Sequence, residues 1–253
     1  MIFTTTFVCG FFVLTNNCFS YRGHDANAVI LFQIIKGIAY RVTVGAANRK
    51  QSANEEKTMI PYRQFLHKQS FSFEEVLAFS RGSLVSDPPD GFEARLPAPP
   101  FLMIDRIVEL ESKGSKGKIV AEQDVRLDAW YFQCHFTADP VQPGCLGVDA
   151  IWQLLGFFCV WRGALGTGRA LGCGEVLFNG QIRPFNKTVR YEIDVRRYSH
   201  LKDSGASVVV GDGRVYVDDA LIYTVGQAKT GIFTGIAYPD YPARSKNSAG
   251  GIM

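Results

Sequence analysis

The chain lacks the closely spaced cysteine and histidine pairs of a metal site. It has four histidines, and its six cysteines stand at positions 9, 18, 134, 145, 159 and 173 without any C-x-x-C pair. Because protein zinc sites usually draw ligands from such pairs, this spacing argues against a metal. Irregularly spaced cysteines are typical of a reducing compartment, so we expect free thiols and a cytoplasmic protein.

The chain also lacks a strong excess of charge of either sign. It carries 27 Lys and Arg residues against 24 Asp and Glu, which gives a formal net charge of +3. There is no long basic run and no recognisable nucleic-acid motif, so we expect no binding to nucleic acid. The hydrophobic content of 47% and charged content of 20% are those of an ordinary globular protein, and no internal repeat is present.

No hydrophobic run near the N-terminus is suited to cross a membrane. The apolar run within residues 1–14 has no basic residue before it, unlike a standard secretory signal. The run Ala28–Ile35 is shorter than the ~20 residues that span a bilayer. Arg41–Thr58 is polar and resembles a linker. We therefore expect residues 1–58 to be an extension outside the catalytic fold, and residues 59–253 to form one domain without stable membrane insertion.

Two interpretations of this extension are open. Met59 lies where the folded domain is expected to begin, so residues 1–58 are interpreted as the product of a start codon assigned too early. The alternative is a membrane or targeting segment. N-terminal sequencing of the native protein distinguishes them, because a chain that begins at Met1 rejects the first interpretation.

The segment from Trp130 to Trp161 carries the clearest signal of function. Its second half, 146–161, is apolar or small at nearly every position, which predicts a helix that is buried on all sides. Asp149 lies inside this run, where an apolar environment is expected to raise its pKa and keep it protonated. The Pro143-Gly144 pair predicts a helix start whose backbone N–H groups are free to bind an anion.

His135, a lone histidine in the polar and aromatic stretch before this helix, completes a set of three chemical roles. A neutral imidazole supplies a base, the helix start supplies an oxyanion site, and Asp149 supplies an acid, as proton abstraction next to a carbonyl requires. Each residue also has a plain structural interpretation. His135 is equally compatible with a core or surface histidine, and Asp149 with stabilisation of the helix dipole.

The remaining sequence predicts an antiparallel sheet around this helix. Ser72–Ser80 has the pattern of a short capped helix. Alternation and turn residues predict several strands. The predicted strands are Phe101–Leu110, Lys118–Val125, Val189–Val195, a hairpin of Val208–Val210 and Arg214–Val217 around the turn Gly211-Asp212-Gly213, and Leu221–Val225. We expect an α+β fold with one long buried helix.

Several motifs of the chain occur in one known family. The active-site segments are His135-Phe136, Asp139-Pro140-Val141, Pro143-Gly144-Cys145-Leu146-Gly147, Asp149-Ala150 and Trp152-Gln153-Leu154. The flanking segments are Leu96-Pro97-Ala98-Pro99, Met103-Ile104-Asp105-Arg106, Gly168-Arg169-Ala170-Leu171-Gly172, Gly174-Glu175-Val176 and Leu221-Ile222-Tyr223-Thr224. In this order they resemble the bacterial 3-hydroxydecanoyl-[acyl-carrier-protein] dehydratase/isomerase. The resemblance covers about residues 71–233.

The resemblance implies a hot-dog fold and a homodimer, in which the histidine of one subunit faces the aspartate of the other. It implies dehydration of a medium-chain 3-hydroxyacyl group on acyl carrier protein to the trans-2-enoyl thioester, without a metal or organic cofactor. His135 takes the C2 proton, and Asp149 protonates the departing hydroxyl. The Gly144 N–H binds the thioester oxygen, Cys145 lies beside it, and Gln153 orients Asp149. We interpret Cys145 as a packing residue, because this chemistry needs no nucleophile, and a nucleophilic thiol at the helix start is the alternative.

The family also converts trans-2 to cis-3 products. Dehydratases that do not isomerise carry Glu at the position of Asp149, and this chain has Asp, with Cys145 and Trp152 as in the isomerising group. We therefore favour the bifunctional enzyme. Gln142 replaces an apolar Met of the family and is expected to alter the tunnel mouth, and the tail 238–253 has no counterpart.

Four basic residues are candidates for docking the acidic carrier protein. They are Arg196, Arg197, Lys202 and Lys229. The alternative is a solvated strand edge without a partner. Three other functions remain open. They are a dehydratase without isomerase activity, a hot-dog acyl thioesterase, and a non-catalytic acyl-binding module that does not need His135.

Overall fold

The computed structural model describes residues 13–15, 18–22, 29–35, 38–44 and 58–236. The chain divides into two compact units, residues 1–57 and residues 58–253. The assignment of residues 1–58 to an extension outside catalysis stays a prediction. The tail 238–253 and most of the proposed linker, 45–57, lie outside the described residues.

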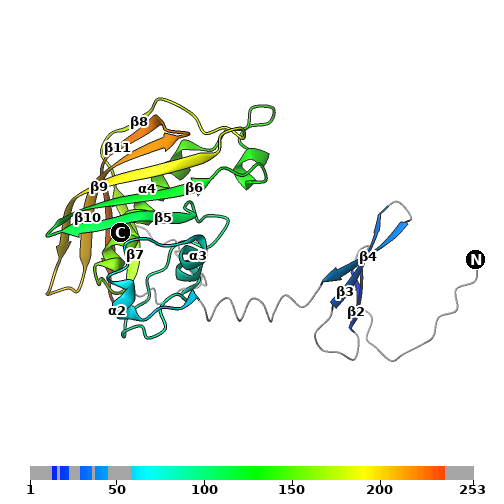
Figure 1. Ribbon diagram of the computed structural model, residues 1–253, viewed down its shortest axis with the longest axis horizontal. Coiled ribbons are helices and arrows are strands. Elements are labelled where there is room, and N and C mark those ends of the chain that lie inside the picture. Colours follow the sequence, from blue (N-terminus) through cyan, green and yellow to red (C-terminus); the bar gives the residue numbers. More distant parts are fainter. Residues whose placement is uncertain (1–12, 16–17, 23–28, 36–37, 45–57, 237–253) are drawn as a thin grey trace, which may run out of the picture. The chain divides into compact units, whose positions relative to one another are not determined.

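The first unit contains an antiparallel sheet of four short strands (Figure 1). The strands follow one another in space as they do in sequence, β1-β2-β3-β4. Their bounds are β1 Val13–Thr15, β2 Cys18–Arg22, β3 Val29–Ile35 and β4 Ile38–Val44. Within the apolar run noted in the sequence, Val29–Ile35 therefore forms a strand. The polar segment that was expected to be a linker from Arg41 onward begins inside β4.

The second unit is an antiparallel sheet of seven strands with one long helix, α4 (Figure 1). The sheet order is β5-β6-β9-β10-β11-β7, and β8 pairs with β11. The strands are β5 Arg106–Lys113, β6 Lys116–Asp124, β7 Thr167–Gly172, β8 Val176–Phe178, β9 Thr188–His200, β10 Ser207–Val217 and β11 Ala220–Phe233. The helices are α2 Tyr62–Phe65, α3 Phe73–Arg81, the 3-10 helix η1 Trp130–Gln133 and α4 Gly144–Trp161. An antiparallel sheet with a helix, as in the hot-dog fold, is therefore confirmed.

The buried helix α4 packs against β9, β10 and β11. Side chains of β10 alternate strictly between buried and partly exposed positions, so one face of that strand is turned toward the core. Among the described helices, α4 is long and apolar enough to cross a membrane by length and composition, but 72% of it is buried inside the protein. Such burial is typical of the core helix of a folded domain, as predicted from its apolar sequence.

The predicted hairpin around Gly211-Asp212-Gly213 is wrong. These residues lie inside the single strand β10, and the turn to β11 is made by Asp218 and Asp219, which both have positive φ. The glycines serve close packing, because a Cβ at Gly213 would lie 2.4 Å from the Ile151 side chain of α4. The pattern that resembles a turn therefore marks a place where the sheet closely approaches the helix.

The helix α3 is confirmed close to its predicted bounds. Ser72 caps it, and the Ser72 and Glu75 side chains each bond the other's backbone N–H. The strand predicted from Phe101 begins five residues late, at Arg106. Residues Phe101 and Met103 bond to a side chain of α4 instead of a neighbouring strand.

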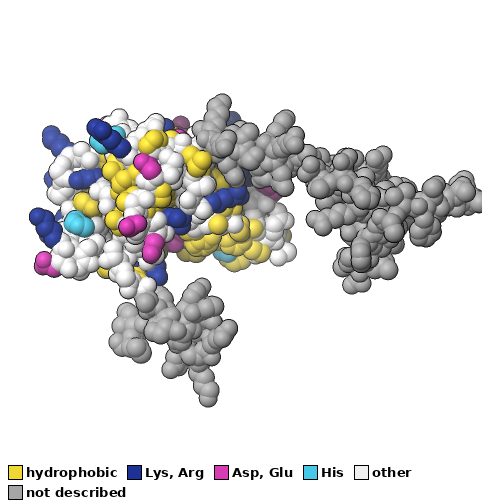
Figure 2. Space-filling model, turned by 90° about the horizontal axis from the view of Figure 1, so that it is seen from below, with side chains coloured by type: hydrophobic (Ala, Val, Ile, Leu, Met, Phe, Trp, Pro, Cys, Tyr) yellow, Lys and Arg dark blue, Asp and Glu magenta, His cyan; other side chains and the backbone are white. Residues whose placement is uncertain are grey.

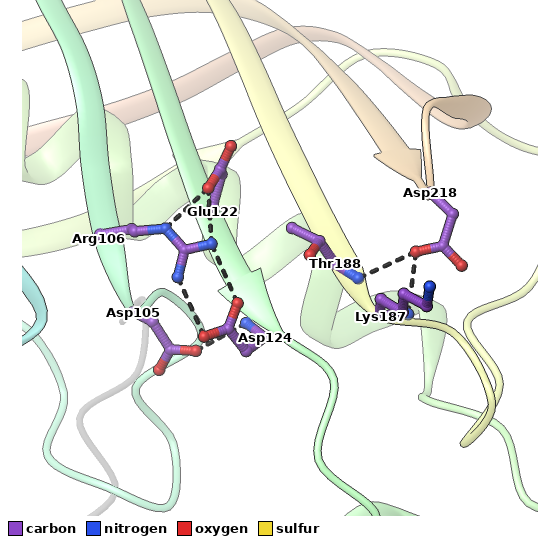
Figure 3. Close-up of polar contacts among 7 residues, drawn as sticks. All are labelled: Asp105, Arg106, Glu122, Asp124, Lys187, Thr188 and Asp218. Atoms are coloured by element: carbon purple, nitrogen blue, oxygen red, sulfur yellow. Dashed lines mark hydrogen bonds and ion pairs between the residues drawn. The ribbon is translucent and has the colours of Figure 1, made fainter.

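Polar contacts secure the end of the β5–β6 pair (Figure 3). The Asp124 N–H donates to Oδ2 of the buried Asp105 at 2.7 Å. The Arg106 guanidinium lies 2.7 Å from Glu122 and 3.0 Å from Asp124. The motif residues Asp105 and Arg106 therefore hold these two strands together and lie outside the cavity described below.

Candidate active site

His135 lies at the base of a tight loop, residues 135–141, which we call the His135 loop. The Val141 N–H donates to the His135 carbonyl at 2.7 Å, and the Phe136 and Asp139 backbones bond to each other at 3.0 Å in both directions. The His135 N–H donates to the Tyr131 carbonyl of η1 at 2.8 Å. The loop is thus closed on itself and attached to η1.

The His135 ring is held by a backbone carbonyl. Nδ1 of the half-buried ring lies 2.9 Å from the Val141 carbonyl oxygen. Because a carbonyl oxygen can only accept, Nδ1 carries the proton and Nε2 keeps a lone pair. Within the part of the chain that the structure describes, no group bonds Nε2. Nε2 is therefore the atom of His135 that can act as a base.

The start of α4 leaves backbone donors free. Pro143 is the N-cap and provides no side-chain hydrogen bond, and among the described residues nothing accepts from the N–H groups of Gly144 and Cys145. A Cβ at Gly144 would lie 2.6 Å from the Phe178 ring, so a side chain there requires Phe178 to move. The Cys145 thiol is exposed. These free donors and the helix dipole form a site for a developing oxyanion.

Asp149 is half-buried on α4 and is held by Gln153. The Gln153 Nε2 donates to Asp149 Oδ2 at 2.6 Å and to the Phe101 carbonyl at 3.0 Å, and its Oε1 accepts from the Met103 N–H at 3.2 Å. Burial raises the pKa of Asp149 above its ordinary value, and the hydrogen bond from Gln153 partly offsets this rise. The net shift favours the protonated form more than water does, which is the direction that an acid requires.

A cavity of about 380 Å³ opens beside Asp149. One wall is a face of α4, because the residues that line it recur three or four positions apart. They are Asp149, Trp152, Gln153, Gly156, Phe157 and Val160. Asp149 and Val160 are eleven positions apart, which corresponds to about 16 Å along the helix. This helix wall is polar at Asp149 and Gln153 and apolar from Gly156 to Val160, and Arg95 and Arg169 also line the cavity.

The opposite wall of this cavity comes from other elements. Gly168–Ala170 of β7, Thr230 and Ile232 of β11, and Phe79 of α3 line it. Phe79 packs edge-on against Phe157, with ring centroids 4.8 Å apart, and both rings are buried. His135 does not line this cavity. The single chain thus does not bring the predicted base and the predicted acid together in this cavity.

The strand β7 lies at the free end of the sheet order. One of its edges pairs with β11, and no described strand pairs with the other. The Trp152 indole donates to the Gly172 carbonyl at 3.2 Å, which attaches the strand to α4. An open edge beside the Asp149 cavity is a ready place for a further strand.

Gln142 is buried, with an exposure of 1%, and does not line the cavity beside Asp149, so its expected effect on a tunnel mouth stays a prediction. Its N–H donates to the Ile182 carbonyl at 3.0 Å. Its side-chain amide lies near the Tyr191 hydroxyl and has no hydrogen bond among the described residues. Its direction into the core follows from the tertiary fold.

The candidate docking residues lie around β9–β11. Arg197 and Lys229 both pair across from Val210, so these two exposed residues belong to one row on one face. Arg196 forms an ion pair with Asp212, and Lys202 is exposed in the turn 201–206. Figure 2 shows one face of the second unit, where Lys and Arg side chains lie among hydrophobic ones without a single large basic area.

Sequence reasoning missed the groups that hold the two catalytic candidates in place. The Val141 carbonyl, the Phe101–Met103 backbone and Arg183, which contacts the His135 loop, carry no local signal of function. Gln153 and Phe101 are 52 positions apart in sequence, so only the fold brings them together. Among the described residues no group of three His, Cys, Asp or Glu could hold a metal ion.

Comparison with known proteins gives one family and several distant folds. The model of the FabA-like domain matches residues 96–226. The dehydratase heterocomplex ApeI:P from Xenorhabdus doucetiae is similar at 12% identity and a TM-score of 0.40, over 53% of this chain and 84% of that chain. An uncharacterized protein from Erwinia carotovora subsp. atroseptica is similar at 15% identity and a TM-score of 0.34, over 49% of this chain and 90% of that chain. AziG of S. sahachiroi is similar at 13% identity and a TM-score of 0.35, over 50% of this chain and 89% of that chain.

Proposed function

This chain belongs to the FabA-like family of hot-dog dehydratases, and from this premise we propose that it dehydrates medium-chain (3R)-3-hydroxyacyl-[acyl-carrier-protein] to the trans-2-enoyl thioester. The observation that carries the proposal is the position of Asp149. Burial raises its pKa, and close to the start of α4 it lines a cavity whose helix wall is apolar from Gly156 to Val160 and whose lining also includes Arg95 and Arg169. An acid beside an apolar channel suits a hydroxyl that must leave from a fatty acyl chain.

In the proposed reaction, Nε2 of His135 takes the proton from C2. The electron pair of that bond forms the C2–C3 double bond, the C3–O bond breaks, and Asp149 gives its proton to the departing hydroxyl, so water leaves. The N–H of Gly144, with the exposed Cys145 beside it, donates a hydrogen bond to the thioester oxygen while negative charge develops on that oxygen. One such donor is worth about 3 kcal/mol in the transition state.

We further propose isomerisation of the trans-2 product to cis-3, a step toward unsaturated fatty acids. Isomerisation moves a proton from C4 to C2, so an acid and a base must face the same chain. The support is the identity of the residue at position 149, an Asp, together with Cys145 and Trp152 as in the isomerising group. The described cavity extends well past Asp149 along α4, as a chain that reacts at C4 requires.

The proposed enzyme is a homodimer with shared active sites. Two observations support it. His135 is absent from the cavity that contains Asp149, and β7, which lines that cavity, has an open edge. Pairing of two such edges would bring a second subunit next to Asp149. Acyl carrier protein is the proposed partner, docked on Arg196, Arg197, Lys202 and Lys229. The cytoplasm is the proposed compartment, since Cys134, Cys145, Cys159 and Cys173 are free thiols.

The test is product analysis of the purified full chain with a C10 3-hydroxyacyl thioester, with the trans-2 and cis-3 enoyl products resolved by NMR. Both products are expected. Trans-2 alone would reject the isomerase, and release of free acid and thiol would identify a thioesterase. His135→Ala is expected to abolish turnover and to retain substrate binding. If the wild-type protein binds the thioester but forms no product, the protein is a non-catalytic acyl-binding module.

A further inference from the structure

The side of the His135 loop that follows Asp139 is held from outside by one arginine. Arg183, in the segment between β8 and β9, forms an ion pair with the Asp139 carboxylate, and its Nη1 also lies 3.4 Å from the Pro140 carbonyl. The adjacent Ile182 is fully buried and accepts the Gln142 N–H at 3.0 Å. Two successive residues of one segment therefore brace the chain on both sides of Val141.

This segment is itself fixed to the sheet. The Arg183 N–H donates to the Asn186 side-chain oxygen at 2.7 Å, and the Asn186 amide donates to Asp218 at 2.9 Å. Asp218 makes the turn between β10 and β11 and also accepts the N–H groups of Lys187 and Thr188 (Figure 3). These three donors hold the pKa of Asp218 below its ordinary value, and the Thr188 N–H has the largest effect. The Asp218 carboxylate therefore stays ionised and hydrogen-bonded at neutral pH.

We propose that Arg183 is a positioning residue for His135. It fixes Asp139 and Pro140, and so fixes the Val141 carbonyl that receives Nδ1 of the catalytic ring. The brace extends from the β10–β11 turn through Asn186 to the loop. Because the arginine donates to a carboxylate and a carbonyl together, it restrains the loop better than one point contact does.

The brace matters because the Val141 carbonyl decides which ring nitrogen carries the proton. If that carbonyl moves, the ring loses its acceptor at Nδ1, and the tautomer that leaves Nε2 free is no longer favoured. The ring also loses its fixed direction. A displacement of about 1 Å at a reacting group can cost on the order of 100-fold in rate. The effect on turnover rests on the proposed function, whereas the effect on the tautomer does not.

The test compares Arg183→Leu with Arg214→Leu in the full chain. Arg214 is a matched control, since its ion pair with Asp194 is similarly half-exposed and lies on β10 outside the cavity and the candidate docking set. Both variants are expected to lower Tm by no more than about 4 °C, as for a surface ion pair. Nitrogen-15 NMR of the histidine rings, with His135 assigned by His135→Gln, reports the tautomer without substrate.

We expect Arg183→Leu to convert the His135 ring from one Nδ1–H tautomer to a mixture, and to lower kcat on a short thioester roughly 10- to 100-fold with KM nearly unchanged. Arg183→Lys should partly restore the Nδ1–H tautomer of His135 and partly restore kcat. Arg214→Leu should change neither. A wild-type tautomer and kcat in Arg183→Leu would overturn the inference, as would an equal loss in the control. If the wild-type protein shows no turnover but the His135 tautomer still changes in Arg183→Leu, the proposed function is rejected. The role of Arg183 in positioning His135 is then retained.

Discussion

The side-chain amide of Gln153 donates a hydrogen bond to Oδ2 of Asp149 at 2.6 Å, from one turn farther along α4. This bond stabilises the ionised carboxylate and so opposes the rise of the Asp149 pKa that burial causes. The same amide group bonds the backbone at Phe101 and Met103. Gln153 thus sets both the direction and the acidity of the proposed acid.

Replacing Gln153 by Leu is expected to raise the pKa of Asp149 further and to lower kcat. The alkaline limb of the pH dependence of kcat/KM, where Asp149 loses its proton, should move to higher pH. This limb is measured with a short soluble thioester. A limb that stays in place or moves to lower pH would contradict the assignment of Gln153. Gln153→Glu should move the limb in the same direction, since a second carboxylate also disfavours ionisation of Asp149.

Asp149→Asn is expected to stabilise the protein increasingly as pH rises. The folded-state pKa of Asp149 is raised, so the stabilising neutral form is present below the ordinary Asp value of ~3.9 and is lost as pH rises through the folded pKa. Asn cannot ionise and does not suffer this loss. The difference in Tm between variant and wild type should therefore be larger at pH 8 than at pH 4. A difference that is constant over this range would mean that the pKa is not raised.

Two inactive variants are expected to complement each other if the site is shared. His135→Ala and Asp149→Asn should each be inactive alone. After joint unfolding and refolding in equal amounts, mixed dimers have one intact site, which gives about a quarter of wild-type activity in a symmetric dimer. The measurement is turnover of the mixture against each variant treated alone. No recovery, with mixed dimers detected by mass spectrometry, would place both residues of a site in one subunit.

Charge reversal at Arg197 and Lys229 is expected to raise KM for carrier-bound substrate by at least tenfold and to leave a short soluble thioester unaffected. These two residues flank Val210 in one row of the sheet. They test docking more cleanly than Arg196, whose reversal would also place like charge against Asp212. Steady-state kinetics on both substrates, at low and high salt, measures the effect. An equal loss on both substrates would reject docking and favour a solvated strand edge.

Gly156→Leu is expected to shift the preferred acyl chain to shorter lengths. Gly156 lines the apolar part of the cavity, and a Cβ there would make an ordinary contact of 3.5 Å with Thr230, so Gly156→Ala should fold normally. Each methylene that loses its place costs about fourfold in kcat/KM. Relative kcat/KM for C4 to C12 substrates measures the shift, with the C4 substrate as internal control. An unchanged profile would mean that the acyl chain does not lie along this face of α4.

The sequence alone determined the parts that depend on neighbours within a few residues. The apolar run up to Trp161 indicated a buried helix, Ser72 and Glu75 indicated a capped one, and alternation indicated the half-buried strand from Val189. Each prediction depends on periodicity or on a local hydrogen bond, which a linear pattern contains. The raised pKa of Asp149 also follows from its apolar neighbours.

Only the tertiary structure decided how distant segments meet. Gly211 and Gly213 resemble a turn by composition, but they lie inside β10, where Gly211 faces Leu155 and Gly213 faces Ile151 of α4. The bond from Gln153 to Asp149 is local and was predicted, but Gln153 is held in turn by the Phe101 carbonyl, 52 positions away, and His135 by the Val141 carbonyl, and every residue has such a carbonyl. Such partners depend on the path of the chain in space, so no local pattern of side chains specifies them.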